Sequence, residues 1–168
     1  MTSDPSPWPR SPERAELLAL YAEADGLLDG WTCHCSASEA SDPADVPCCH
    51  FAVTGREPYP TSVELEEVRH AMKAAGIQAR DPRRLPRVDL KPCPLLGRDG
   101  RCRIYASRPF GCRTFFCEGA AAPFGARARV PRDALLALGR RIADLSGRFS
   151  PRDPHPRPLV RALVGQSR

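Results

Sequence analysis

Apolar residues recur at intervals of three and four positions in three segments of the chain, and this spacing predicts three amphipathic helices. The first helix is expected to begin after Ser11, which can cap it, with Pro12 at the first helical position. Gly30 is expected to mark its end. Its apolar face consists of Leu17, Leu18, Tyr21, Ala24 and Leu28.

The other two predicted helices have equally clear boundaries. Thr61 and Glu64 have the spacing of a capping box, and Gly76 is expected to end the helix that follows them. Its apolar face consists of Leu65, Val68, Met72 and Ala75. The third helix is expected over about 132–146, with Gly147 as its end. Its apolar face consists of Leu135, Leu138, Ile142 and Leu145.

The segments between these helices have patterns typical of loops and short elements. The stretch from Trp31 to Pro47 is rich in Ser, Asp and Pro and is expected to be a loop, and HFAVTG (50–55) is short enough for a strand or extended segment. Four prolines break 79–94, GRDG (97–100) is a turn signal, and CRIYASRP (102–109) suits a short helical turn. We therefore expect a small, mainly α-helical single domain of about three main helices, with cysteine-rich, metal-tied loops and little strand.

Length and composition favour one domain with two irregular ends. The 168 residues include 19 prolines, many of them near the termini. Residues 1–10 are expected to be a disordered N-terminal segment, 11–147 a cysteine-cluster metal-binding domain, and 148–168 a flexible Pro/Arg-rich tail.

The expected cellular compartment determines how the cysteines are interpreted. The N-terminal sequence lacks the basic and apolar regions of a secretory signal, and no run of about 18 apolar residues suggests a membrane span. A cytoplasmic location is therefore expected, where thiols stay reduced. Under these conditions eight cysteines indicate metal binding rather than disulfides. Disulfides are the alternative if the chain is exported by another route.

All eight cysteines are candidate metal ligands. Thiolates are soft ligands that suit zinc and iron–sulfur clusters, and eight exceed the four that one zinc ion takes. The adjacent pair Cys48 and Cys49 favours a cluster or two nearby metals over one tetrahedral ion. The five that we assign first are Cys48, Cys49, Cys93, Cys102 and Cys112, followed by Cys33, Cys35 and Cys117. His34 and His50 lie beside cysteines and are further candidates.

Arginines lie between the last four cysteines. A metal held by four thiolates carries net negative charge, which nearby guanidinium groups could offset while lowering the thiol pKa values. The candidate cofactor-binding residues for this role are Arg101, Arg103, Arg108 and Arg113. The alternative is that they face solvent or pair with Asp89, Asp99 and Glu118.

Charge is distributed unevenly along the chain. Residues 1–79 carry 5 basic and 13 acidic side chains, whereas residues 80–168 carry 20 basic and 7 acidic ones. The basic half raises nucleic acid as a partner, although no nucleic-acid-binding motif accompanies it. The sequence also lacks a nucleotide-binding glycine motif and a cysteine-protease signature.

The segment CPLL…GRCRIYASRPFGCRTF resembles the signature C-P-x-L…C-x-I-Y-x-x-R-P-x-x-C-R of the YkgJ-type cysteine-cluster family. The resemblance covers roughly residues 31–118. The family's C-x-x-C-x-x-C-C run is replaced here by CHC, twelve residues and CC, and Cys117 is an additional cysteine. The family is described as zinc- or iron-chelating, so the resemblance implies a bound metal. A larger relative, the flagellin lysine methylase, has a similar motif, but this chain is shorter and methylation is not carried over.

These observations lead to two functional hypotheses. The first is a metal-binding cysteine-cluster protein that chelates iron as an iron–sulfur cluster, or zinc, and has a redox or catalytic role. The second is a structural zinc-binding module that interacts with protein or nucleic acid without catalysis. The sequence does not assign an enzyme class.

Overall fold

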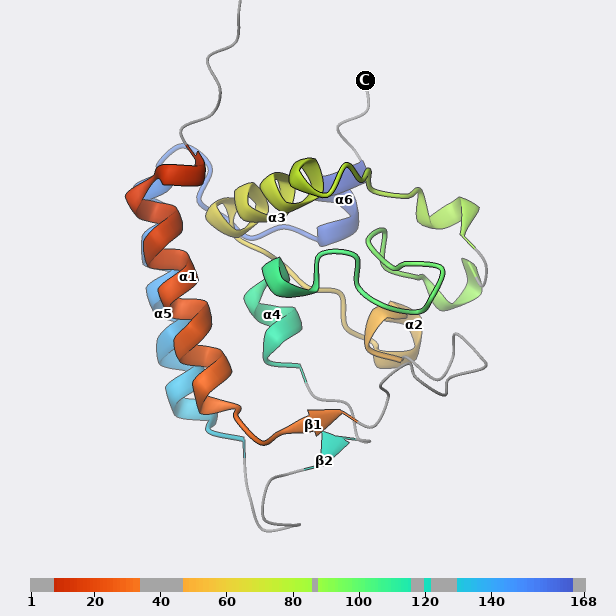
Figure 1. Ribbon diagram of the computed structural model, residues 1–168, viewed down its shortest axis with the longest axis horizontal. Helices are drawn as coiled ribbons and strands as arrows, with labels where there is room; N and C mark the ends of the chain where they lie inside the picture. The colour runs from red at the N-terminus through yellow and green to blue at the C-terminus, as the bar shows by residue number, and fades with distance from the viewer. Residues whose placement is uncertain (1–7, 34–46, 86–87, 116–119, 122–129, 165–168) are drawn as a thin grey trace, which may run out of the picture.

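The chain forms a mainly helical single domain in which three helices of seven or more residues predominate. The computed structural model describes residues 8–33, 47–85, 88–115, 120–121 and 130–164. The main helices are α1 (Pro12–Leu27), α3 (Ser62–Ala74) and α5 (Arg132–Phe149). Helices α1 and α5 lie side by side, and α3 contacts both near one end (Figure 1). The expected fold class is confirmed.

The three helices begin close to where the sequence predicts. The Ser11 side chain accepts the backbone N–H of Arg14 at 3.1 Å, which satisfies a donor that the first turn of α1 leaves unpaired. At α3 the capping box between Thr61 and Glu64 is present in both directions. Gly76 has a φ of 62°, the left-handed conformation that commonly follows a helix C-terminus.

The remaining described elements are short. They are η1 (Trp8–Arg10), β1 (Thr32–Cys33), η3 (Pro47–Cys49), α2 (Phe51–Thr54), η4 (Pro82–Arg84), η5 (Val88–Leu90), η6 (Tyr105–Ser107), α4 (Phe110–Arg113), β2 (Ala120–Ala121) and α6 (Leu159–Val164). Strands β1 and β2 form a two-residue antiparallel ladder with Thr32 opposite Ala121 and Cys33 opposite Ala120. The short helical turn expected before Pro109 is η6.

The described residues form two apolar clusters that meet at α3. The first lies among α1, α5 and Trp8 and includes Val63 of α3. The second contains Leu65 and Val68 of α3 together with apolar residues of the cysteine-bearing loops and α6. Because α3 contributes to both, it fixes the cysteine-bearing region against the helical part of the fold.

The segment HFAVTG differs from the expectation of a strand. Residues Phe51–Thr54 form helix α2 instead, and Gly55 follows it in the left-handed conformation, with a φ of 63°. The N–H groups of Val53 and Thr54 both donate to the carbonyl of His50, which closes a helical turn. A short apolar run does not distinguish a buried helical turn from a strand.

Within the described residues, segments 8–10 and 148–164 are more ordered than the sequence predicts. Helix α5 continues through Gly147 to Phe149, whose ring contacts Trp8 with centroids 5.2 Å apart. Trp8 itself is 2% exposed, although 1–10 was expected to be disordered. Residues 148–164 are not the flexible tail that we expected, because Leu159 of α6 is buried in the second cluster. Burial of these apolar side chains outweighs the helix-breaking tendency of glycine and proline.

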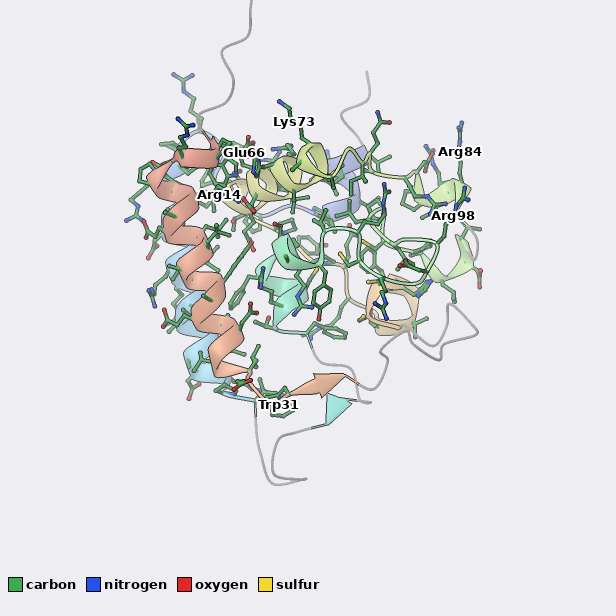
Figure 2. The ribbon with its side chains drawn as sticks, viewed as in Figure 1. Arg14, Trp31, Glu66, Lys73, Arg84 and Arg98 are labelled. Carbon is green, nitrogen blue, oxygen red and sulfur yellow. The ribbon has the colours of Figure 1, made fainter. Side chains whose placement is uncertain are left out.

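Two buried carboxylates on α3 connect the two halves of the fold. Glu67 accepts hydrogen bonds from Trp8 Nε1 at 3.1 Å, Arg14 Nε at 2.7 Å and Ser107 Oγ at 2.9 Å. Figure 2 shows Arg14 at the beginning of α1, beside α3. Burial raises the pKa of Glu67, but these hydrogen bonds outweigh burial and hold the pKa below its usual value.

Glu64, one turn earlier in α3, also connects the two halves of the fold through hydrogen bonds. It accepts hydrogen bonds from Tyr21 Oη at 3.2 Å and from the backbone N–H of Phe110 at 2.7 Å, in addition to its capping contacts with Thr61. α1, α3 and α4 are therefore joined through one carboxylate.

Among the described helices, none is long and apolar enough to cross a membrane.

We predict that Glu67→Ala lowers the free energy of unfolding by about 3 kcal/mol, because it leaves several buried donors without an acceptor. Glu66→Ala is the matched control, since Glu66 is more exposed and its nearest cation, Arg69, lies 3.6 Å away. Its expected effect is within about 0.5 kcal/mol. Urea unfolding followed by far-UV circular dichroism measures both values, and equal losses in the two variants would contradict the role assigned to Glu67.

Candidate metal centre

Backbone hydrogen bonds align the first cysteine pair with the segment that carries Cys93. The Cys93 N–H donates to the carbonyl of Cys49 at 2.8 Å, and the Phe51 N–H donates to the carbonyl of Lys91 at 3.0 Å. Lys91 has a φ of 50°, an uncommon conformation for a residue with a side chain, at the point where the chain turns into this pairing. These contacts place segments 48–49 and 93 side by side.

A tight loop brings the next cysteine back to the same region. Leu96 and Cys102 form an isolated antiparallel bridge, and the Gly97 N–H donates to the carbonyl of Arg101 at 2.8 Å. The loop requires glycine at two positions: a Cβ at Gly97 would lie 2.4 Å from Asp99 Oδ1, and Gly100 has a φ of 72°. The turn signal in GRDG is therefore confirmed.

The fifth described thiol, that of Cys112, comes from α4. The Cys112 N–H donates to the carbonyl of Pro109 at 2.9 Å, and Glu64 accepts the N–H of Phe110 at the start of this helix. Glu64 therefore determines where Cys112 lies relative to α3, and its charge contributes to raising the Cys112 pKa. The sequence pattern identified Glu64 only as a helix cap.

The five described thiols interact with one another electrostatically, and no disulfide joins them. Hydrogen bonding between Cys48 and Cys49 lowers the pKa of Cys48 to about 7 and raises that of Cys49. Burial, and then the neighbouring thiols, raise the pKa of Cys93 and bring that of Cys112 to about 12. Burial also raises the pKa of Cys102. The interior of this region therefore disfavours free thiolates.

The five thiols share a region but do not converge on one point. Among the residues that the structure describes, no group of three or more His, Cys, Asp or Glu side chains could hold a metal ion as they stand. Electrostatic interaction extends further than the contact distance that a metal ligand needs, so the two observations are compatible. Metal binding would require rotation of the thiol side chains.

Arg108 is the arginine that faces the thiols. Its positive charge lowers the pKa values of Cys48, Cys102 and Cys112. Its guanidinium carbon lies 3.9 Å from the centroid of the Tyr105 ring. Its Nε atom is buried and has no hydrogen-bond partner among the described residues. A buried donor without an acceptor is unusual, and an anionic sulfur would satisfy it.

Arg113 has a different position from the one that its sequence spacing suggested. Its side chain is 6% exposed and bonds Asp25 Oδ2 at 2.6 Å, the carbonyl of Arg108 at 3.0 Å and the carbonyl of Ala106. It also lies over the Tyr21 ring, 4.2 Å from the centroid. Arg113 therefore connects α4 to α1, and its hydrogen bonds go to oxygen rather than sulfur.

Arg101 and Arg103 also differ from the proposed role beside the thiols. The Arg101 side chain is exposed and has no hydrogen bond or ion pair within the described ranges. Arg103 donates from Nη1 to the carbonyl of Gln78 at 3.1 Å. Of the four candidate arginines, Arg108 is the one whose charge acts on the described thiols.

Several candidate ligands cannot be placed. Cys35, Cys117 and His34 lie outside the described residues, and Cys33 is described only through its backbone in β1. His50 is buried beside Cys49, forms an isolated bridge with Pro92 and has an interaction partner. The expected role of these residues as ligands stays a prediction.

Comparison with known proteins gave no relatives for this chain. No family model matches it, and no curated protein or solved structure shows significant similarity.

We predict that Arg113→Ala lowers the free energy of unfolding by about 2 kcal/mol, because two backbone carbonyls and Asp25 lose a buried donor. Arg141→Ala is the control, since Arg141 also pairs with an acid of α1, Glu23 at 2.7 Å, but at an exposed position. Its expected effect is below about 1 kcal/mol. Chemical denaturation monitored by tryptophan fluorescence distinguishes the two, and a neutral Arg113→Ala would exclude a structural role.

Proposed function

We propose that this chain binds a metal cluster through its cysteine thiols and that the bound form is an iron–sulfur cluster. The described ligands in this proposal are Cys48, Cys49, Cys93, Cys102 and Cys112. The proposal agrees with the resemblance to the YkgJ-type cysteine-cluster family, and it extends to Cys33, Cys35 and Cys117 as further ligands.

The chemistry of the donors supports a cluster. Five soft sulfur ligands from separate segments exceed what one tetrahedral ion takes. The side chains of the adjacent Cys48 and Cys49 interact by a hydrogen bond, so their sulfurs lie close to each other. Such a pair is suited to two metal atoms of one cluster.

The observation that carries the proposal is the state of Arg108. A cluster held by thiolates has net negative charge, which a buried protein region tolerates only with compensating charge or donors. Arg108 provides a positive charge that acts on three of the thiols and a buried Nε–H with no acceptor among the described residues. In the proposal, a thiolate or sulfide sulfur of the bound group would accept this hydrogen bond.

Binding would change side-chain conformation and protonation. The thiols would have to lie closer together than they do in this structure, by rotation of the cysteine side chains or by movement of the loops that carry them. The raised pKa values of Cys93, Cys102 and Cys112 mean that binding would release protons. Metal affinity is therefore expected to increase with pH.

The roles of the chain's own residues follow from this arrangement. The thiolates would hold the group, Arg108 would offset its charge, and the apolar residues around Cys93 would restrict water. When bound, an iron–sulfur cluster supplies one-electron redox chemistry.

The proposal predicts that Cys102→Ser, purified without oxygen, contains less iron and acid-labile sulfide per chain than the unaltered protein, because a hydroxyl is a poor ligand for iron in such clusters. Cys102 is partly exposed, which limits the effect of the change on folding. Metal and sulfide analysis measures the result, together with the absorbance at about 400 nm.

Ala106→Ser is the control for this experiment. It introduces a serine at an exposed position of the same loop without removing a thiol. Its iron and sulfide content should equal that of the unaltered protein. Undiminished iron and sulfide in a folded Cys102→Ser protein would remove Cys102 from the ligand set, and an unaltered protein without iron would reject the cluster.

A second prediction concerns Arg108. Arg108→Gln should increase the rate of metal loss to a competing chelator by about tenfold, the equivalent of one lost charge-assisted hydrogen bond. Arg101→Gln is the matched control, with the same loss of charge at an exposed position near the same loop, and its rate should be unchanged. Equal rates in both variants would show that Arg108 does not interact with the bound group.

A structural zinc site is the second candidate function. It is favoured by the position of Cys93, which is 7% exposed and belongs to the second apolar cluster. A metal at this place would add a cross-link between the segments that pack in this cluster. Stoichiometric zinc, with neither iron nor sulfide, would favour this function in the metal analysis described above.

A further inference from the structure

A cleft of about 690 Å³ lies beside the cysteine-bearing loop and has no role in the function proposed above. One wall is the segment that comes after α3 in the chain, and the other is the turn between Leu96 and Cys102. Its lining consists of Gln78, Ala79, Arg80, Gly97, Arg98, Asp99 and Arg103. Figure 2 shows Arg98 at the edge of the molecule opposite α1.

Hydrogen bonds fix the two walls of this cleft relative to each other. The Arg80 N–H donates to the carbonyl of Pro94 at 2.9 Å, and Arg103 Nη1 donates to the carbonyl of Gln78 at 3.1 Å. The second wall is the glycine turn in which Gly97 has no room for a Cβ. The cleft is therefore preorganised, which lowers the entropic cost of binding a ligand.

The charge of the cleft is positive. Three guanidinium groups line it, against the single carboxylate of Asp99. Asp99 Oδ1 accepts the backbone N–H of Arg101 at 3.1 Å, so part of its hydrogen-bonding capacity is directed into the turn. Arg98 is exposed and forms no hydrogen bond or ion pair with any other described residue. Arg80 Nη1 donates a long hydrogen bond, 3.5 Å, to the carbonyl of Leu96.

We propose that this cleft binds a small phosphate-bearing molecule. Arginine presents several N–H donors in a planar fork that matches phosphate oxygens, and three arginines line this cleft. The volume lies in the range of small-molecule sites, about 300–1,000 Å³. Among the described residues that line it, no apolar side chain is larger than alanine, which favours a charged ligand over a hydrophobic one.

The lining favours a small ligand over nucleic acid. Sites for single-stranded nucleic acid combine basic residues with aromatic side chains on which bases stack. Within the described part of the chain, no aromatic residue lines this cleft. The proposed ligand is therefore a phosphate ester, and the site is independent of the identity of the metal.

The test uses Arg98→Gln and isothermal titration calorimetry of the full chain, as purified, at low ionic strength. The probes are fructose 1,6-bisphosphate and inorganic phosphate, with chloride as a reference. The bisphosphate is expected to bind with one site per chain, and Arg98→Gln is expected to weaken it by about tenfold or more, the loss of one charge-assisted contact. Inorganic phosphate is expected to compete with it.

Arg140→Gln is the matched control. Arg140 is exposed on α5, outside the cleft, and the variant has the same net charge as Arg98→Gln. Its affinity for the bisphosphate should equal that of the unaltered protein. Chelation of a bound metal by the probe would affect both variants equally, so the comparison isolates the contribution of the cleft.

Three results would overturn the proposal. The first is no binding of either phosphate probe. The second is equal affinity in the Arg98→Gln and Arg140→Gln proteins. The third is binding of a uridine oligonucleotide or a polyglutamate peptide that is tighter than that of the bisphosphate and is lost in Arg98→Gln, which would assign the cleft to a macromolecule.

Discussion

The arrangement of this protein depends on the need of two buried carboxylates for hydrogen-bond donors. Glu64 and Glu67 project from α3 into the interior, where an ionised group is stable only if several donors surround it. Those donors come from η1 and α1 on one side and from η6 and α4 on the other. Each carboxylate needs hydrogen-bond donors from both sides. This requirement fixes the position of the cysteine-bearing segments relative to the helices.

The arginines around the cysteines have separate tasks that follow from their surroundings. Arg113 is buried against oxygen atoms and an aromatic ring, so it stabilises the contact between α4 and α1. Arg108 acts on the thiols, and Arg103 connects the two walls of a basic cleft. The arginines that are close in sequence therefore have different structural and electrostatic surroundings rather than one shared charge-balancing role.

The candidate centre is assembled mostly by backbone contacts between loops. The pairing of Cys49 with Cys93 and the bridge between Leu96 and Cys102 hold the first four described cysteines, and α4 adds Cys112. Apolar residues of these loops pack in the second cluster, and the glycine turn and the carboxylate contacts add to that packing. The thiols then lie near enough to influence one another's pKa values.

The sequence by itself determined the three main helices, because Ser11, the capping box of Thr61 and Glu64, and the spacing of apolar residues are local signals. It also singled out Cys48, Cys49, Cys93, Cys102 and Cys112 as the first candidate ligands, and that role stays a prediction. Tertiary structure decided what local signals leave open: Phe149 contacts Trp8 and extends α5 past Gly147, and Leu159 enters the second cluster from a proline-rich segment. Tertiary structure also gave Arg108 and Arg113 different surroundings, the first beside the thiols and the second in the contact between α4 and α1. The physical reason is that burial and charge pairing depend on residues distant in the chain, which no local pattern specifies.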